Sequence, residues 1–301
     1  MIYTVTLNPS LDYVMNIENL NLGLVNRSAK EVKDCGGKGL NISRMLTNLG
    51  VENIALGFVG GDIGTEILEI AKKCGVITDF VTLSKGVSRI NVKLRHGQDT
   101  EINAVGPEIT ATDMEKFIGK IIKLKEGDTL ILAGNLQPSV SEDFYSIIGS
   151  IAKNNGVRVV VDATGNQLVL ALKSRPFMIK PNIFELEEIF NVKINTRDEI
   201  IKYAKKLKNM GADNVIVSLG KAGAMLIAMD ENIYEVKAPE IETVYTVGSG
   251  DSLDAGFIYG YDLTKSFEKA LKWGVACGCA TASSEGIGTG EKAENIYLSI
   301  I

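Results

Sequence analysis

Apolar strand-like runs alternate with helical patterns through most of the chain, and this order constrains the fold more than any other feature. Strands are expected at 54–59, 129–133, 157–161 and 215–219, and helices at 64–74 and 142–154. A β-α-β-α order favours a mainly parallel sheet with helices on both faces. In such sheets the ligand crevice lies beyond the carboxyl ends of the strands. The loops that begin at Gly60, Gly134, Asp162 and Gly220 are therefore where function is expected.

Two segments, 11–33 and 87–105, break this rhythm because they mix polar and apolar residues without a helical period. Residues 88–95 alternate in polarity, turn at 96–99 and resume at 100–105, as a β-hairpin would. We expect the two segments to form a small β-sheet that serves as a lid or a dimer surface. The sequence shows no repeat or flexible linker, which predicts a single domain over residues 1–301.

Composition excludes several classes of protein. A net charge of -5 gives no reason to expect a nucleic-acid or membrane partner, and no apolar run is long enough to span a bilayer. The start lacks the basic region of a signal peptide and the four cysteines are scattered, so we expect a cytoplasmic protein with reduced thiols. A single histidine, His96, disfavours a Ser-His-Asp triad or a His-rich metal site. Catalysis is expected to use carboxylates, lysines and backbone amides.

The strongest candidate site is the loop at 246–252. Gly248, Ser249 and Gly250 allow a tight turn that leads into a helix N-terminus, where free amide groups and the helix dipole favour an anion. In a transferase this loop could hold the γ-phosphoryl group while Asp251 accepts the proton of the nucleophile. Taken alone, the pattern is more simply explained as an Asp-capped helix behind a glycine turn.

A second glycine-rich run, at 35–41, lacks the spacing of a P-loop. Its glycines, among them Gly37, would bring the backbone close to a ligand, and Lys38 and Asn41 offer groups suited to sugar hydroxyls or a phosphate. A plain turn that opens a helix at 41–49 would show the same residues.

The hairpin strand places Arg89, Asn91, Lys93 and Arg95 on one face, because side chains two apart on a strand point the same way. Three cations and an amide suit a dianionic phosphate, although a solvated strand explains the pattern equally well. Asn103, on the return strand, is a further candidate for the same space.

Two weaker patterns follow later in the chain. Lys180 precedes Asn182 and Glu185, whose spacing is that of a helix capping box and also suits an outer-sphere magnesium site. The strand–turn–strand pattern at 217–224 could contact a nucleotide, but an ordinary β-turn would look the same.

Together and in this order, these motifs resemble the ribokinase/PfkB carbohydrate kinase family over essentially the whole chain. The resemblance is carried by the runs at 6–12, 36–41, 89–94, 179–182 and 247–252. It implies a ribokinase-like three-layer α/β/α sandwich with a mainly parallel central sheet and a small β-sheet lid, with the acceptor sugar between lid and core. It also implies ATP as co-substrate with Mg²⁺, and a possible homodimer through the lid.

The resemblance implies roles for individual residues. Asp251 would be the general base, and Gly248, Ser249 and Gly250 would form the anion hole. The acceptor sugar phosphate would be bound by Asp12, Gly37, Lys38, Asn41, Arg89, Asn91, Lys93 and Asn103, with its phosphate on the three cations of this set. ATP would lie near Lys180, Asn182, Ser218, Gly220, Gly223, Gly248, Gly250, Gly278 and Ala282, with magnesium held indirectly by Asn182 and Glu185.

The acceptor is harder to choose. The lid strand at 89–94 is similar to that of family members that use fructose 1-phosphate, whereas the 36–41 and 248–251 runs look more like those that use tagatose 6-phosphate. Because the lid strand contacts substrate, we expect phosphorylation of fructose 1-phosphate at its 6-hydroxyl, with tagatose 6-phosphate as the alternative. A sugar-phosphate-binding regulator without catalysis is a lower alternative, since the Asp251 loop is intact. A nucleoside or vitamin acceptor would not call for Arg89 and Lys93 together.

The chain departs from the family pattern at two places. The run at 134–139, with Asn135 and Gln137, stands where relatives usually carry a Gly-Ser-Leu-Pro-like turn, so one wall of the site is expected to differ. Asp254 adds a second acid to the first turns of the catalytic helix. We expect it to face away from the phosphates, because a nearby carboxylate would repel them.

Overall fold

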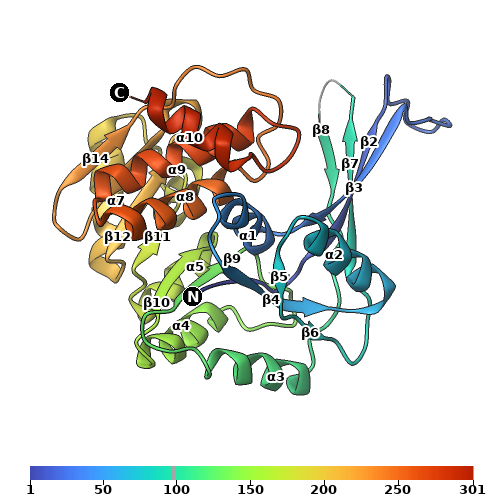
Figure 1. Cartoon of the computed structure of the whole chain (residues 1–301), viewed down its shortest axis with the longest axis horizontal. Coiled ribbons are helices and arrows are strands. Elements are labelled where there is room, and N and C mark those ends of the chain that lie inside the picture. The colour runs from blue at the N-terminus through green and yellow to red at the C-terminus, as the bar shows by residue number, and fades with distance from the viewer. Residues whose placement is uncertain (97–98, 301) are drawn as a thin grey trace.

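The computed structural model describes residues 1–96 and 99–300, which form one large and one small β-sheet (Figure 1). The large sheet has ten strands in the order β14-β13-β12-β11-β10-β9-β1-β4-β5, with β6 paired to β4. Its strands are β1 (Ile2–Thr6), β4 (Asn53–Val59), β5 (Ile77–Thr78), β6 (Val81–Thr82), β9 (Thr129–Ala133), β10 (Arg158–Asp162), β11 (Met178–Ile179), β12 (Asn214–Ser218), β13 (Ala224–Ile227) and β14 (Ile233–Val236). All pairs are parallel except β12–β13 and β13–β14.

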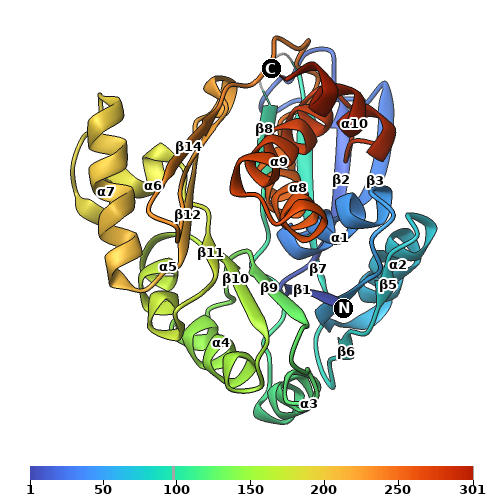
Figure 2. The same cartoon turned by 60° about the vertical axis from the view of Figure 1, so that its left-hand side comes forward.

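Helices cover both faces of this sheet, which confirms the expected three layers (Figure 2). One face carries α3 (Ala111–Ile121), α4 (Phe144–Asn154), α5 (Gly165–Ala171), α6 (Ile183–Phe190) and α7 (Arg197–Met210). The other carries α1 (Lys38–Asn48), α8 (Ser249–Thr264), α9 (Phe267–Ala282) and α10 (Gly290–Ser299). Among the described residues, no helix combines the length and the apolar character that crossing a bilayer requires.

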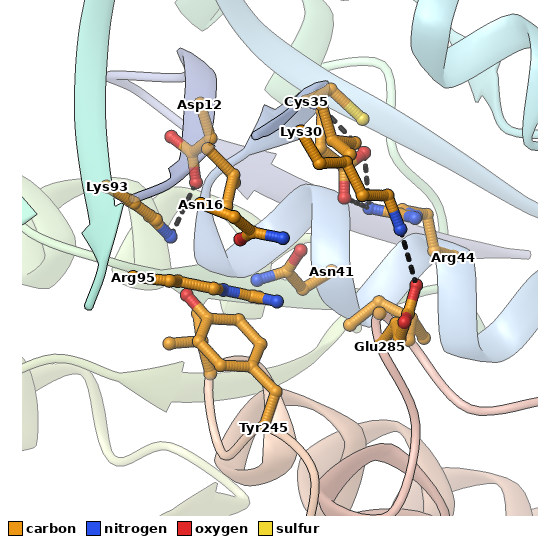
Figure 3. Close-up of a pocket in the computed structure, with 16 residues that line it drawn as sticks. Asp12, Asn16, Lys30, Cys35, Asn41, Arg44, Lys93, Arg95, Tyr245 and Glu285 are labelled. Carbon is orange, nitrogen blue, oxygen red and sulfur yellow. Dashed lines mark hydrogen bonds and ion pairs between the residues drawn. The ribbon is translucent and has the colours of Figure 1, made fainter. Parts of the chain in front are cut away.

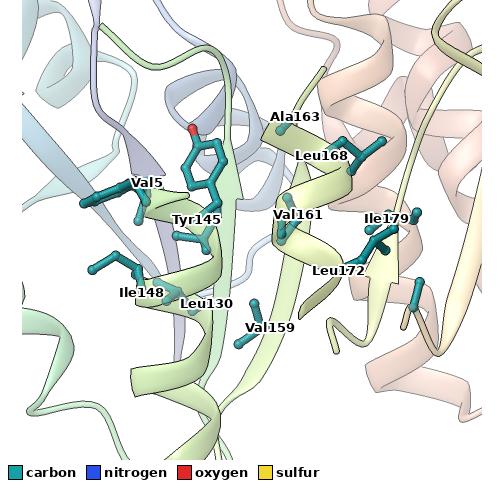
Figure 4. Packing of buried hydrophobic residues seen from close by; sticks show 14 of the residues in the cluster. Val5, Leu130, Tyr145, Ile148, Val159, Val161, Ala163, Leu168, Leu172 and Ile179 are labelled. Atoms are coloured by element: carbon teal, nitrogen blue, oxygen red, sulfur yellow. The ribbon is translucent and has the colours of Figure 1, made fainter. Parts of the chain in front are cut away.

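The central strands are continuous apolar runs because both of their faces are buried, as is typical of parallel sheets. Along β9, Leu130 and Leu132 point into the core beneath α4, whereas Ile131 points into the core beneath α8 and α9. Val159 and Val161 of β10 continue the first of these cores (Figure 4). Because β9, β10 and β11 pair in parallel, their carboxyl ends lie at one edge of the sheet.

The small sheet stands off the core as the expected lid (Figure 1). Its order is β3-β2-β7-β8, from strands β2 (Ser10–Asn16), β3 (Lys30–Gly36), β7 (Arg89–Arg95) and β8 (Asp99–Ile102). Helix α2 (Gly61–Lys73) packs against the base of β2 and β3. The register pairs Asp12 with Asn91 and Val14 with Lys93, so these side chains share one face. Part of the predicted turn at 96–99, residues 97–98, lies outside the described residues.

Helix boundaries differ from the predicted ones by a few residues. The helix expected at 142–154 begins at Phe144, because Ser141 and Asp143 form a turn in which the Ser141 hydroxyl donates to Asp143 at 2.6 Å. The helix expected at 64–74 begins earlier, at Gly61, directly after β4.

Helices α8 and α9 pack with their backbones in near contact because glycines line their interface. A Cβ atom on Gly256 would lie 2.5 Å from the Trp273 carbonyl oxygen, and one on Gly278 would lie 3.1 Å from the Ser249 carbonyl oxygen. Glycine is needed where two backbones approach this closely. The start of α8 is therefore held tightly against α9.

Candidate active site

The loop that opens α8 has the backbone geometry expected of an anion-binding site. Gly248 has a φ of 84° and caps the helix, and the first bond along the helix axis runs from the Ser252 N–H to the Gly248 carbonyl at 2.8 Å. The amides of Gly250 and Asp251 precede this bond and lack an intrahelical acceptor, at the positive end of the helix dipole. The Ser249 hydroxyl is buried and has no partner among the described residues. These unpaired donors favour an anion at this loop.

Asp251 lies in the first turn of α8 and its residue is only 7% exposed. Its Oδ2 accepts a hydrogen bond of 2.8 Å from the Asn41 amide. Burial raises the pKa of the Asp251 carboxyl and Asp162 adds to the rise, whereas Lys38, Asn41 and Lys180 oppose it. A carboxylate with a raised pKa beside such a loop is suited to be a general base.

A buried cluster of charges lies beneath the anion loop. Asp162 ends β10 and Lys180 follows β11, so neighbouring parallel strands deliver the two side chains to the same edge. Lys180 Nζ lies 3.3 Å from Asp162 Oδ2, and Lys38 Nζ lies 3.1 Å from Asp162 Oδ1. A Cβ atom on Gly250 would lie 3.3 Å from Lys180 Nζ, which places this ammonium directly against the loop.

These pairings control the ionisation of the cluster. Although burial opposes ionisation, Lys180 and Lys38 hold the pKa of Asp162 well below its usual range. Burial also opposes the charge of Lys180, but the Asp162 carboxylate outweighs it and raises the pKa of Lys180. The sequence pointed to Asp162 only as the start of a loop beyond a strand, and its ion pairs with two lysines were not foreseen.

A cleft opens between the lid and the core (Figure 3). The lid contributes Asp12, Asn16, Lys93 and Arg95, and the core contributes Asn41 and Tyr245. Asp12 accepts hydrogen bonds from the Ser10 hydroxyl at 2.6 Å and from the Asn91 amide at 3.2 Å, and it pairs with Lys93 at 2.8 Å. Because Asn41 lines the cleft and also bonds to Asp251, a ligand in the cleft lies next to the candidate base.

Two residues of the cleft, Arg95 and Tyr245, were absent from the substrate-binding set that the resemblance implied, although Arg95 was among the lid cations considered for a phosphate. The Arg95 guanidinium lies 4.1 Å from the centroid of the Tyr245 ring, a cation–π contact that fixes its position. Its Nε is buried and has no hydrogen-bond partner among the described residues. The alternation of the lid strand had placed Arg95 on the correct face. No pattern in the sequence signalled Tyr245, whose position depends on the path of the loop before α8.

The structure separates the three cations that were expected to share the acceptor's phosphate. Lys93 lines the cleft, whereas Lys38 pairs with Asp162. Arg89 lies at the base of the lid, where it donates to the carbonyl oxygens of Asn8 at 3.2 Å and Ala104 at 3.0 Å.

Three other predicted substrate residues have different positions. Asn91 is buried beside Asp12, and Gly37 caps α1 with a φ of 130° that favours glycine. Asn103 is exposed beyond β8 and does not line the cleft.

The residues expected near ATP line the adjacent sheet edge. Asn182 caps α6 and bridges to Ser218 at the end of β12, and Gly220 and Gly223 both adopt positive φ in the turn that follows. Gly278 abuts the start of α8. The Ala282 carbonyl accepts bonds from the amides of residues 244 and 245, which anchors the loop before Gly248.

Asn182 and Glu185 form the capping box that their spacing predicted. Glu185 Oε2 accepts from the Asn182 N–H at 2.8 Å, and Asn182 accepts from the Glu185 N–H at 2.9 Å. Burial raises the pKa of the Glu185 carboxyl and Asp162 adds to the rise, whereas Lys38 and Lys180 lower this pKa. No group of three metal-binding side chains occurs in residues 1–96 and 99–300. Glu185 Oε2 is engaged in the capping box, which leaves one oxygen of this half-buried carboxylate for a metal. That arrangement fits a magnesium ion held through water and does not fit an ion enclosed by protein ligands.

The two departures from the family pattern are structurally distinct. Gln137 is buried and donates to the Leu7 carbonyl at 2.9 Å, which ties the loop at 134–139 to the end of β1, while Asn135 accepts from the Thr164 hydroxyl. The expectation that Asp254 faces away from the phosphate region is wrong. Asp254 is fully buried on the same side of α8 as Asp251 and lies 3.6 Å from Lys180. Lys180 offsets the repulsion that had been expected to exclude it.

Comparisons with known proteins agree over almost the full length. A family model described as pfkB family carbohydrate kinase matches residues 5–294. The chain is 42% identical over 300 residues to the 1-phosphofructokinase of Bacillus subtilis (strain 168), with 100% of this chain and 98% of that protein covered. It is 36% identical over 310 residues to the tagatose-6-phosphate kinase of Staphylococcus epidermidis (strain ATCC 12228), with 100% and 98% covered. The structure of phosphofructokinase-2 from Escherichia coli in complex with fructose-6-phosphate matches with a TM-score of 0.93 at 27% identity, covering 99% and 98%.

Proposed function

The chain belongs to the pfkB family of carbohydrate kinases, and we propose that it transfers the γ-phosphoryl group of ATP to the 6-hydroxyl of fructose 1-phosphate. As a member of this family it is a sugar phosphotransferase that uses ATP as co-substrate. The observation that carries the proposal is the contact between Asp251 and Asn41, because it joins the anion loop of α8 to the cationic cleft under the lid.

In the proposed reaction the sugar lies in the cleft with its hydroxyls on Asp12 and Asn41. The two cations of β7 that line the cleft, Lys93 and Arg95, bind the phosphate that the sugar already carries. Asp251 takes the proton of the 6-hydroxyl while the hydroxyl oxygen forms a bond to the γ-phosphorus of ATP. The bond from the γ-phosphorus to the oxygen that bridges it to the β-phosphate breaks, which releases ADP. Amides of the 248–251 loop stabilise the charge on the transferred group, so catalysis depends on position and electrostatics.

We assign Lys38 to the transferring phosphoryl group and not to the phosphate of the acceptor. Among the neighbouring cations, Lys38 lowers the pKa of Asp251 most strongly, which fits a place near the reacting atoms. Its ion pair with Asp162 holds the ammonium at the carboxyl edge of the sheet, on the side of the proposed ATP site.

We also propose that Mg²⁺ accompanies ATP and is held through water by Asn182 and Glu185. The bound ion would supply neutralisation of charge on the phosphates. The chain's own contribution is the capping box, which orients the Glu185 carboxylate toward the cluster of Lys38, Asp162 and Lys180.

The test is ATP-dependent ADP release with magnesium on fructose 1-phosphate, tagatose 6-phosphate, fructose 6-phosphate and ribose in parallel. We expect fructose 1-phosphate to have the highest kcat/KM, by about tenfold or more. Tagatose 6-phosphate is the second candidate, because a curated relative at 36% identity is a tagatose-6-phosphate kinase. A higher kcat/KM for tagatose 6-phosphate would retain the mechanism and reject our acceptor. No turnover on any of the four, by folded protein that binds ATP, would reject the proposed reaction.

We further propose that two copies associate through the outer face of the lid. Ile90 and Ile102 point away from the cleft and are 41% and 59% exposed. In the loop between β2 and β3, Leu22, Leu24 and Val25 are between 72% and 89% exposed. Exposed apolar side chains on the small sheet and on its β2–β3 loop favour an interface.

We expect sedimentation equilibrium to give a dimer mass for the wild type and a monomer mass for Ile102→Lys. A buried lysine without a partner would oppose association. Ile122→Lys is a matched control, because Ile122 is 58% exposed at the end of α3, away from the lid. A monomeric wild type, or an Ile102→Lys variant that remains dimeric, would refute this interface.

A further inference from the structure

The cluster beneath the anion loop has more acidic than basic groups. It contains the carboxyl groups of Asp162, Asp251 and Asp254 and the ammonium groups of Lys38 and Lys180. All except Lys38 are at most 7% exposed. If every group were ionised, one negative charge would remain uncompensated in a region with little water. An unpaired buried charge is costly enough that protonation normally removes it.

Hydrogen bonding in the cluster is also incomplete. Both oxygens of Asp254 and Oδ2 of Asp162 are buried without a hydrogen-bond partner among the described residues. Lys180 lies 3.3 Å from Asp162 and 3.6 Å from Asp254, so its pairing with Asp254 is the longer of the two. The two carboxyl groups lie within hydrogen-bonding reach of each other. One proton between them would give Asp162 Oδ2 a donor and would also neutralise the surplus charge.

We propose that Asp254 is a positioning residue that carries one proton in the working enzyme and donates it to Asp162, so that Asp251 remains ionised as the base. This role in transfer rests on the proposed function, whereas the protonation of Asp254 does not. Held in this way, Asp254 does not cancel the charge of Lys180, which stays available to the anion loop.

The surroundings favour Asp254 over the other two acids as the site of the proton. Asp162 has both lysines beside it, and Asp251 accepts a bond from Asn41. Asp254 has only the more distant contact with Lys180, and burial raises its pKa well above the ordinary value.

Among the described residues, the elements packed around the cluster form no ion pair with Asp254 other than that of Lys180. From α9 the Cys277 thiol approaches Gly256 on α8, and burial keeps this thiol neutral by raising its pKa. Lys38 from α1 faces Asp162 and Asp251, and Glu185 from α6 raises the pKa of Lys180.

The first test is the pH dependence of kcat/KM in Asp254→Asn, measured with the acceptor that the substrate panel identifies. Protonation of Asp251 sets the acid limb, where activity falls as the pH falls. If Asp254 is already neutral, an amide leaves the charge near Asp251 unchanged and the acid limb stays at its wild-type position. If Asp254 were anionic, its loss would lower the pKa of Asp251 and move the limb to lower pH by about one unit or more. Such a shift would overturn the proposal.

Asp262→Asn is the matched control, because Asp262 lies on the same helix but pairs with Arg158 at 2.6 Å on the surface. It should leave the profile unchanged.

The second test observes the proton directly. Infrared spectra of wild-type protein labelled with ¹³C at the aspartate carboxyl carbon should contain the C=O band of a protonated carboxyl at neutral pH. The band should disappear in Asp254→Asn. Its absence from the wild type, or its persistence in the variant, would overturn the assignment. Because this measurement needs no turnover, a protein that shows the band but phosphorylates none of the four sugars would refute the proposed function alone. If Asp254→Asn does not fold, the wild-type band still decides whether a carboxyl is protonated.

Discussion

Asp251→Asn is expected to lower turnover by about 100-fold or more while sugar-phosphate binding is largely retained. Asparagine has nearly the same shape and can still accept the hydrogen bond from Asn41, but it cannot take the proton of the attacking hydroxyl. The amides of the anion loop and the cations of the cleft remain in place, so the substrates should still be positioned. The measurement is kcat from ADP release together with the dissociation constant of the sugar phosphate by calorimetry.

Near-normal turnover in this variant would show that Asp251 is not the base. Turnover and binding that fall together would point to a disturbed fold instead, which thermal denaturation would reveal. Asp262→Asn on the exposed part of the same helix should behave as wild type in both measurements.

Lys180→Met is expected to lower the free energy of unfolding by about 3–5 kcal/mol, the usual result of removing one partner from a buried ion pair. Lys180 is 6% exposed and pairs with Asp162 and Asp254. Methionine fills a similar volume but leaves Asp162 with Lys38 as its only cation. Denaturant titration followed by circular dichroism measures the loss, and turnover should fall as well because the charge next to Gly250 is gone.

The double variant Lys180→Met, Asp162→Asn separates charge from packing. Removing the carboxylate along with its lysine should restore much of the stability, because the uncompensated charge is then absent. A single variant within about 0.5 kcal/mol of wild type, the range of an ordinary surface change, would contradict the role assigned to this pair. A double variant no more stable than the single one would attribute the loss to packing instead.

Much of the fold could be predicted because it depends on local periodicity. The strand at 129–133 was placed without error, since a run of apolar residues between polar ones is typical of a strand buried on both faces. The face of β7 that carries Lys93 and Arg95 followed from the alternation of a strand. The anion loop was recognised because its glycines and Asp251 are adjacent in the chain. In each case the physical cause lies within a few neighbouring residues.

The remainder of the site depends on contacts between residues far apart in the chain. Lys38 and Asp162 are brought together by the order of strands in the sheet, which no local pattern encodes. Arg89 was expected to bind phosphate, but two backbone carbonyls occupy two of its donor groups. The error over Asp254 had the same origin, because the repulsion argument did not include Lys180, which lies 74 positions away by the numbering of the two residues.

The proposed function assigns the choice of acceptor to the lid and the activation of the phosphoryl group to the α8–α9 unit. Most of the residues that line the acceptor cleft belong to the lid, whereas the anion loop is anchored to α9 by glycine contacts such as that of Gly278. A change in the lid can therefore alter which sugar is accepted without moving the groups that perform transfer. Substitutions on the cleft face of the lid are thus separated from the backbone contacts that hold α8 against α9.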